Sequence, residues 1–217
     1  MLRSAIVALA VCAHAPLVLW IDATRTRPEF VEATAIDALP AQLRAEVERD
    51  LAQSLRQRDE FAASARANGL APPQCAPGII GDTLQPVDAV TALRHQPLIA
   101  RGTITGLRNG WDVPRKSAAA VALVRIDEVW KGSGVAPNDV VAVAFPFGTF
   151  DRGGNTWCAV MKGSERIAVG RQLLVFGRLV DGSTSWIAGG GWAVEDGRLF
   201  PPQASSLSLQ SVHSALQ

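Results

Sequence analysis

The sequence predicts a mainly β domain, a closed barrel or a sandwich, preceded by one amphipathic helix and an N-terminal apolar segment. Three observations lead to this prediction. An apolar run follows Arg3, leucines recur every four residues in the segment 39–67, and two-residue alternation with glycine-rich turns dominates after residue 98. With 217 residues, 48% of them hydrophobic, the chain can form one domain with appendages or two small domains.

The alternation is clearest in the segment 118–130, where Ala122 and Val124 share one face and Val121 and Leu123 share the other. The predicted strands are residues 98–107, 118–130, 140–145, 172–180 and 185–188, followed by a hairpin over 191–200 that turns at Asp196-Gly197. The run Gly189-Gly190-Gly191 is predicted to be a loop before that hairpin. Short strands separated by glycine-rich turns are typical of a barrel or a sandwich.

Residues 37–69 are predicted to form the amphipathic helix. One face carries apolar residues at four-residue spacing: Leu43, Val47, Leu51 and Leu55. Asp37 is expected to cap the helix, Pro40 suits the first turn, and Asn68-Gly69 is a stop signal. We expect the leucine face to pack against the adjacent domain, and the alternative is that it binds a partner.

Prolines and glycines then mark a linker around Cys75, where we place a domain boundary. The β domain is predicted to cover residues 73–202. Residues 203–217 follow Pro201-Pro202 and are rich in serine and glutamine, which predicts a disordered tail.

Residues 1–22 are predicted to be a signal peptide or an N-terminal membrane anchor. Arg3 precedes the apolar run Ala5–Ile21, a pattern typical of a secretory signal. Ala13-His14-Ala15 has the small residues of a cleavage site, but Pro16 opposes cleavage; an uncleaved run of about 20 apolar residues would anchor the chain in the inner membrane. The protein is therefore expected to be exported, as a periplasmic, secreted or anchored protein; the alternative is a buried N-terminal helix in a cytoplasmic protein.

The cysteines support this location. Cys12 lies in the leader, so an exported chain would keep the pair Cys75 and Cys158, in a compartment where disulfides persist. We predict that these two are bonded; the alternative is two independent buried thiols. No metal site is predicted, because only His95 and His213 lie beyond the leader and no paired ligand spacing occurs.

Charge and motifs exclude several function classes. The formal net charge is +1 and no basic cluster occurs, so nucleic acid is not an expected partner. No nucleotide-binding or nucleophile motif is present, and no cofactor is predicted. His95, just before the first predicted strand, is expected to be a surface loop residue, and no catalytic residue is assigned.

Five tryptophans within about eighty residues exceed what the core of a small barrel needs, so some are expected to be exposed. Trp111, Trp157 and Trp186 are the candidates for stacking on a ligand or a partner. The alternative is that all five fill the ends of the barrel or cover its loops. A second candidate region is the polar loop Phe147–Thr156, where Asp151 and Arg152 could approach a ligand.

Three short segments resemble bacterial relatives of the tissue inhibitors of metalloproteinases: Ile99–Ile104, Ile126–Gly132 and Val169–Phe176. The resemblance covers roughly residues 73–202. It implies an OB-like, netrin-like barrel of five to six strands, a location outside the cytoplasm, and a disulfide from the segment before the first strand to a later loop. Inhibitors of this type chelate the target's zinc through a free N-terminal cysteine, whereas Cys75 is internal and its peptide nitrogen has no lone pair for a metal.

The sequence thus predicts an OB-like binding or structural module outside the cytoplasm, with another envelope protein as its expected partner. The alternatives are an enzyme with an unrecognised site at Phe147–Thr156 and a protein that inhibits metalloproteinases.

Overall fold

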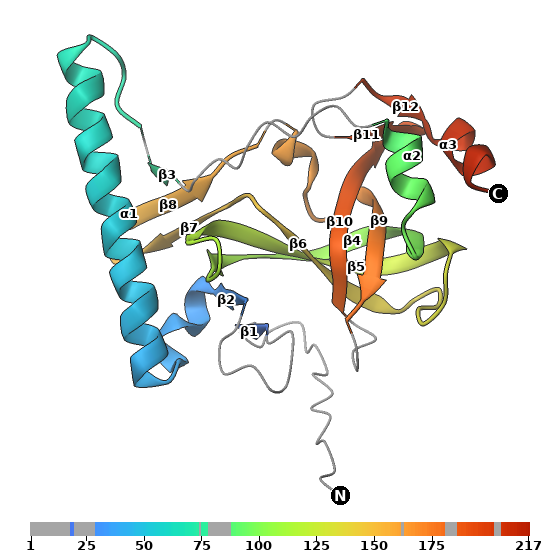
Figure 1. The fold of residues 1–217 in the computed structure, drawn as a ribbon, viewed down its shortest axis with the longest axis horizontal. Helices are drawn as coiled ribbons and strands as arrows, with labels where there is room; N and C mark the ends of the chain where they lie inside the picture. Colours follow the sequence, from blue (N-terminus) through green and yellow to red (C-terminus); the bar gives the residue numbers. More distant parts are fainter. Residues whose placement is uncertain are drawn as a thin grey trace, which may run out of the picture.

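The structure is a computed structural model that describes residues 18–19, 29–73, 75–77, 88–161, 163–180, 186–201 and 205–217. Five of the strands beyond residue 88 form a closed barrel, with a long helix on one side and a pair of short helices on the opposite side (Figure 1). The protein is mainly β, as predicted.

Five strands close the barrel: β4 (Leu98–Asp112), β5 (Ser117–Lys131), β6 (Val140–Phe145), β9 (Gln172–Leu179) and β10 (Trp186–Glu195). Their order around the barrel is β4, β5, β6, β10, β9 and back to β4, with β6 and β10 parallel and the other pairs antiparallel. A five-stranded barrel of this kind is OB-like. The bounds of β6 match the predicted ones, and those of β4, β5 and β9 overlap them.

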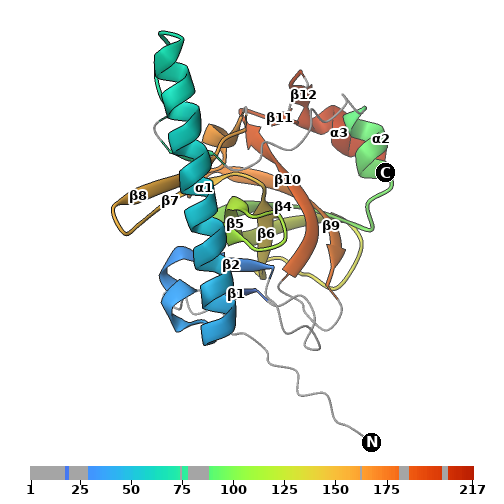
Figure 2. The same cartoon turned by 60° about the vertical axis from the view of Figure 1, so that its left-hand side comes forward.

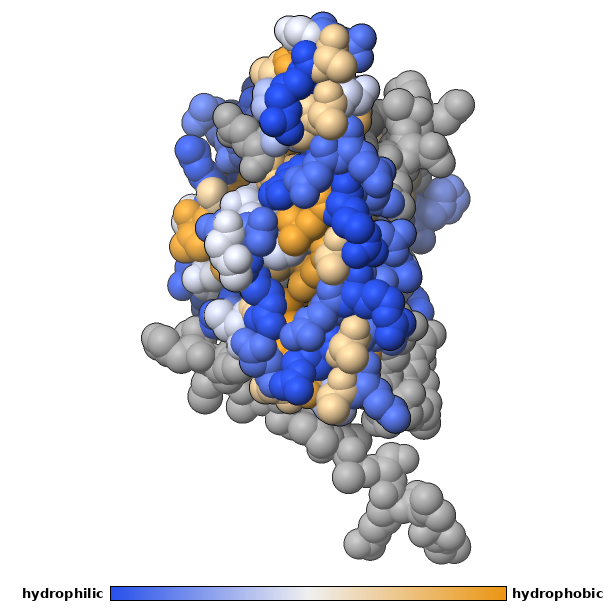
Figure 3. Space-filling view, turned by 90° about the vertical axis from the view of Figure 1, so that its left-hand side faces the viewer, coloured by the Kyte–Doolittle hydropathy of each residue, from blue (hydrophilic) through white to orange (hydrophobic). Residues whose placement is uncertain are grey.

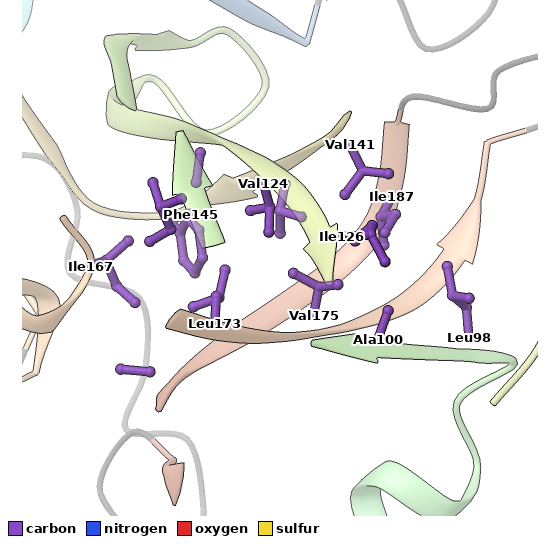
Figure 4. Close-up of a cluster of buried hydrophobic side chains, with 14 of the residues drawn as sticks. Leu98, Ala100, Val124, Ile126, Val141, Phe145, Ile167, Leu173, Val175 and Ile187 are labelled. Atoms are coloured by element: carbon purple, nitrogen blue, oxygen red, sulfur yellow. The ribbon is translucent and has the colours of Figure 1, made fainter. Parts of the chain in front are cut away.

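The predicted alternation fills the barrel. Ala122, Val124 and Ile126 of β5 point inward, and Val121 and Leu123 pack outside, in a cluster with Phe30 and Trp186. Figure 4 shows the inward side chains of β4, β5, β6 and β9 converging on one apolar interior, which we call the barrel core. Burial of this interior supplies the driving force for closing the sheet.

The predicted loop at Gly189-Gly190-Gly191 is wrong, because these residues lie within β10, paired with β9. A Cβ at Gly189 would come within 2.0 Å of the carbonyl oxygen of Phe176, so the two strands approach too closely for any side chain there. The run is therefore part of a strand, and its backbone lies very close to the backbone of β9. The predicted fifth strand and the first arm of the hairpin are one strand, and the turn at Asp196-Gly197 leads into β11 (Arg198–Phe200) as expected.

A second sheet stands beside the barrel. It contains β3 (Ala76–Pro77), β8 (Asn155–Ala159) and β7 (Gly148–Arg152) in that order. The predicted loop over residues 147–156 is therefore wrong: most of it is the β7–β8 hairpin, which turns at Gly153-Gly154, both with positive φ.

The predicted helix is α1 (Ala41–Ala67), preceded by the 3₁₀ helix η1 (Ala33–Ala38). Asp37 is not its cap, since Asp37 lies in η1 and Pro40 holds the N-cap position. The helix ends as predicted, at Asn68 and Gly69, where Gly69 has φ +70°. In Figures 1 and 2, β7 and β8 reach from the barrel to α1, and the C-terminal half of α1 extends past them.

The tail was predicted to be disordered, and that prediction is wrong for its last part. Residues 207–216 form β12 (Leu207–Ser208) and α3 (Leu209–Leu216), capped by the Ser208 hydroxyl. Leu209 and Val212 are buried against Leu93 of α2 (Ala89–Arg94), a short helix that the sequence analysis missed. The apolar positions of the tail have helical spacing, which its serine and glutamine content obscured.

At the N-terminal side, β2 (Phe30–Glu32) pairs with the end of β4 and with β1 (Val18–Leu19). β1 belongs to the predicted leader segment Ala5–Ile21, and the rest of that segment lies outside the described residues. Of the helices the structure describes, none has the length and apolar character needed to cross a bilayer.

Candidate interaction site on the projecting helix

The candidate tryptophans are not on the surface. The exposed fractions of Trp111, Trp157 and Trp186 are 1%, 3% and 9%, so the expectation that they present an aromatic binding face is wrong. Trp111 and Trp157 lie on either side of Phe150, with ring centroids 6.5 Å and 5.5 Å from it. Trp111 and Trp157 are buried because α1 and η1 cover the aromatic face of β4, β7 and β8, whereas Trp186 is buried in a separate cluster with Phe30 and Val121.

We call this buried cluster the lobe core. It joins residues of η1 and α1 to residues of five strands, β2, β4, β5, β7 and β8. Among its members are Leu43, Val47, Leu51, Trp111, Ala118, Phe150 and Trp157. The expectation that the leucine face of the helix packs against the β domain is therefore confirmed.

Arg152 and Asp151 belong to the same region but do not converge on a pocket. The Arg152 guanidinium donates to both carboxylate oxygens of Asp37, at 2.6 Å and 3.0 Å, and to Glu48 of α1 at 3.4 Å. The hydrogen bond and positive charge of Arg152 lower the pKa of Asp37, and the bond to Asp37 in turn raises the pKa of Arg152. Asp151 accepts a hydrogen bond from the Thr156 hydroxyl across the hairpin. Both side chains thus hold parts of this protein together.

Cys75 and Cys158 form the predicted disulfide, with Cα atoms 5.7 Å apart. The bond joins the segment that follows α1 to strand β8, and the adjacent β3 runs parallel to β8. It closes a loop with a sequence separation of 83 residues, which limits how far α1 and the hairpin can separate.

Two further links fix the first half of α1. The indole N–H of Trp157 donates to the carbonyl oxygen of Leu51 at 3.3 Å, and the Lys116 ammonium lies 2.9 Å from the carboxylate of Asp50, which is largely buried. With the disulfide and the Arg152–Asp37 pair, these links form what we call the helix clamp. The base of α1 is therefore held from several directions.

The far end of α1 is free of the barrel. At about 1.5 Å per residue, the 27 residues of α1 extend about 40 Å. Phe61 is 62% exposed, and Leu70, just past the helix end, is 65% exposed. The amide of Leu70 donates to the carbonyl of Ala65 at 2.8 Å, which fixes the chain as it leaves the helix. We call residues 58–70 the helix tip.

Figure 3 views the molecule from the side of α1. This face is mostly hydrophilic, with a narrow strip of hydrophobic surface between hydrophilic margins. The charged side chains along α1 explain the hydrophilic margins and keep the exposed apolar side chains from forming one large patch.

Sequence reasoning missed Phe61, because its side of the helix gives no sign of its exposure. Phe61 is the only aromatic residue of α1, and at about 100° per residue it lies in line with Leu43, on the same side of the helix as the leucines. It is exposed because it lies beyond Leu55, the last residue of α1 that packs against the lobe core. His95, by contrast, is exposed at the end of α2, as expected.

The other two tryptophans of the β domain, Trp130 and Trp192, pack against neighbouring aromatic side chains. Trp130 stacks on His213 of α3 with ring centroids 4.3 Å apart, and Trp192 packs against Phe176. Within the part of the chain that the structure describes, no group of three His, Cys, Asp or Glu side chains gathers as metal ligands would.

The comparisons with known proteins do not assign the chain to a family. No protein-family model matches the sequence, and no curated protein matches it. The resemblance to inhibitors of metalloproteinases stays a prediction, and the site must be interpreted from its own geometry.

Proposed function

We propose that the protein is a binding module outside the cytoplasm that contacts another envelope protein through the helix tip. One observation carries this proposal: a helix clamped at its base presents an exposed aromatic residue, Phe61, at its projecting end. Aromatic residues are enriched among the few side chains that dominate protein interfaces.

The clamp supports the proposal through preorganisation. Binding costs less conformational entropy when the contacting element is already ordered. The Arg152–Asp37 pair holds the chain before α1 and the disulfide holds the segment that leaves the helix tip, so the tip is presented in one orientation. We therefore expect a partner with an apolar pocket that receives Phe61 and a rim that contacts the charged residues around it.

The disulfide also supports the proposed location, because such bonds persist mainly outside the cytoplasm. A reporter that is active only in the cytoplasm should stay inactive when it is fused after Gln217. An active reporter would contradict the location and, with it, an envelope partner.

Site-specific photo-crosslinking tests the contact itself. A photoreactive amino acid replaces Phe61 in the full chain, in cells that naturally make it, and Val169 is replaced in a matched control. Val169 is 61% exposed, as open as Phe61, but lies on the turn before β9. We expect a discrete crosslinked protein from position 61 and none from position 169. Equal crosslinking from both positions, or none from position 61, would overturn the proposal.

A further inference from the structure

The described residues also surround a cavity of about 450 Å³, away from the helix clamp. It lies between the segment 161–167, which contains the 3₁₀ helix η2 (Ser164–Arg166), and the strands β10 and β11. Cavities of about 300–1,000 Å³ are typical of small-molecule sites.

The cavity has an apolar side and a polar side. Phe145, Phe147 and Ile167 supply an apolar side continuous with the barrel core, and Phe200 packs against the same cluster. The polar lining comes from η2 and from Ser205 and Ser206. A ligand here would meet aromatic rings on one part of its surface and hydrogen-bonding groups on another.

Arg166 is the ordered polar group of the cavity. Its guanidinium carbon lies 4.1 Å from the centre of the Phe200 ring, and Nη1 donates to the carboxylate of Glu195. A stacked, carboxylate-bound arginine has lost most of its rotamer freedom, so it can bind an anion at low entropic cost. This bond uses one of the five N–H groups of the guanidinium and leaves further donors for a ligand.

The formal charges near Arg166 balance. Glu195 accepts from Arg166 and also lies 3.9 Å from Arg171, so one carboxylate serves two guanidinium groups. Glu165 also lines the cavity, but it is exposed, and solvent and salt screen its repulsion of an anion. With two arginines against two glutamates there is no net positive charge, so an anionic group would be held by the N–H donors of Arg166 that the bond to Glu195 does not use.

We propose that this cavity binds a small molecule with a flat apolar body and one anionic group, such as a carboxylate or a sulfonate. The apolar body lies against Phe145, Phe147 and Ile167, and the anionic group accepts hydrogen bonds from Arg166. This site is independent of the helix tip and of the function proposed for it.

Two fluorescent probes with the same aromatic scaffold test the proposal: anionic 1-anilinonaphthalene-8-sulfonate and neutral N-phenyl-1-naphthylamine. We expect the purified full chain to bind the anionic probe saturably at one site and more tightly than the neutral one. Arg166→Gln should weaken binding of the anionic probe by about tenfold, the value of one charge-assisted hydrogen bond, and leave the neutral probe unaffected.

Three further variants control for nonspecific binding and for misfolding. Arg178→Gln removes an exposed arginine of β9 remote from the cavity lining and should change neither probe. Ser164→Trp places an indole at the cavity and should block both probes, while Phe61→Ser should leave both unchanged. Circular dichroism and thermal midpoints confirm the fold of each variant. Nonsaturable binding, or anionic-probe affinity unchanged in both Arg166→Gln and Ser164→Trp, would overturn the proposal.

Discussion

The barrel and the region around α1 are held together in different ways. The barrel core contains side chains from five mutually hydrogen-bonded strands, so its stability comes from aliphatic burial and a closed backbone ladder. The α1 lobe, which we define as η1, α1, β3, β7 and β8, has no closed ladder of strands, and its apolar lobe core is supplemented by a disulfide, ion pairs and an aromatic stack. The difference suggests that the lobe can be released while the barrel stays folded.

The largest expected effect comes from removing the disulfide. The double variant Cys75→Ser/Cys158→Ser, or reduction of the native protein, should lower the free energy of unfolding by about 4 kcal/mol in the chain-entropy account. Thermal unfolding with and without reductant measures this loss. Reductant should not change the melting of the double variant, and a native protein that melts identically when reduced would refute the stabilising role.

Leu51→Asp should cost about 3 kcal/mol, because it places a charge without a partner in the lobe core. Ala52→Asp adds the same charge at the next, exposed position of α1 and is the matched control. Chemical denaturation of both variants compares the two costs. Similar costs at positions 51 and 52 would show that the leucine face is not buried in solution.

Substitutions in the glycine run of β10 test the pairing of strands β9 and β10 in the barrel. Gly189→Ala should cost about 2 kcal/mol, since its Cβ would collide with the backbone of β9 and the strands would have to move apart. Gly190→Ala meets only the Phe176 ring, at 3.3 Å, which can shift, and should cost less. Denaturation midpoints rank the two variants, and the reverse order would contradict the strand pairing of β9 and β10.

The smallest effect is the pH dependence of the Arg152–Asp37 pair. The pKa of Asp37 is lowered in the folded protein, so its stabilisation is present above the ordinary carboxyl pKa and is lost as pH falls through the lowered value. Asp37→Asn should therefore lower the thermal midpoint slightly at neutral pH and not at about pH 2. Asp37→Asn should also have no effect when Arg152 is already replaced by Met. A difference that persists in acid, or in that background, would contradict the pairing.

The strands and α1 were predictable from sequence because their signals are local. Alternation defined β5, four-residue spacing defined α1, and glycine after Asn68 ended it. The lobe was not predictable, because its contacts join residues that are far apart in the sequence. Arg152 binds Asp37, 115 positions away, and Trp157 is buried only because α1 packs over it. The Gly189 run misled because glycine indicates either a turn or a close approach of strands, and only the partner strand distinguishes them.

The candidate site, too, was predictable from the sequence only in part. Cys75 and Cys158 were identified correctly, because they are the only two cysteines after residue 22 and therefore allow one pairing there. The tryptophans were misjudged, because composition reports that aromatic residues are numerous and not which element covers them. Phe61 lies on the same side of α1 as the leucines, so its exposure depends on where the packed part of the helix ends, which the sequence does not tell.

Native-state hydrogen exchange on oxidised and reduced protein tests most directly whether the clamp holds the lobe onto an independently stable barrel. After reduction, we expect the lobe to open locally, so that amides of α1 and of the β7–β8 hairpin exchange. Amides of β4, β5, β9 and β10 should stay protected. Exchange of all these amides together, in one cooperative opening with the disulfide reduced, would contradict the account.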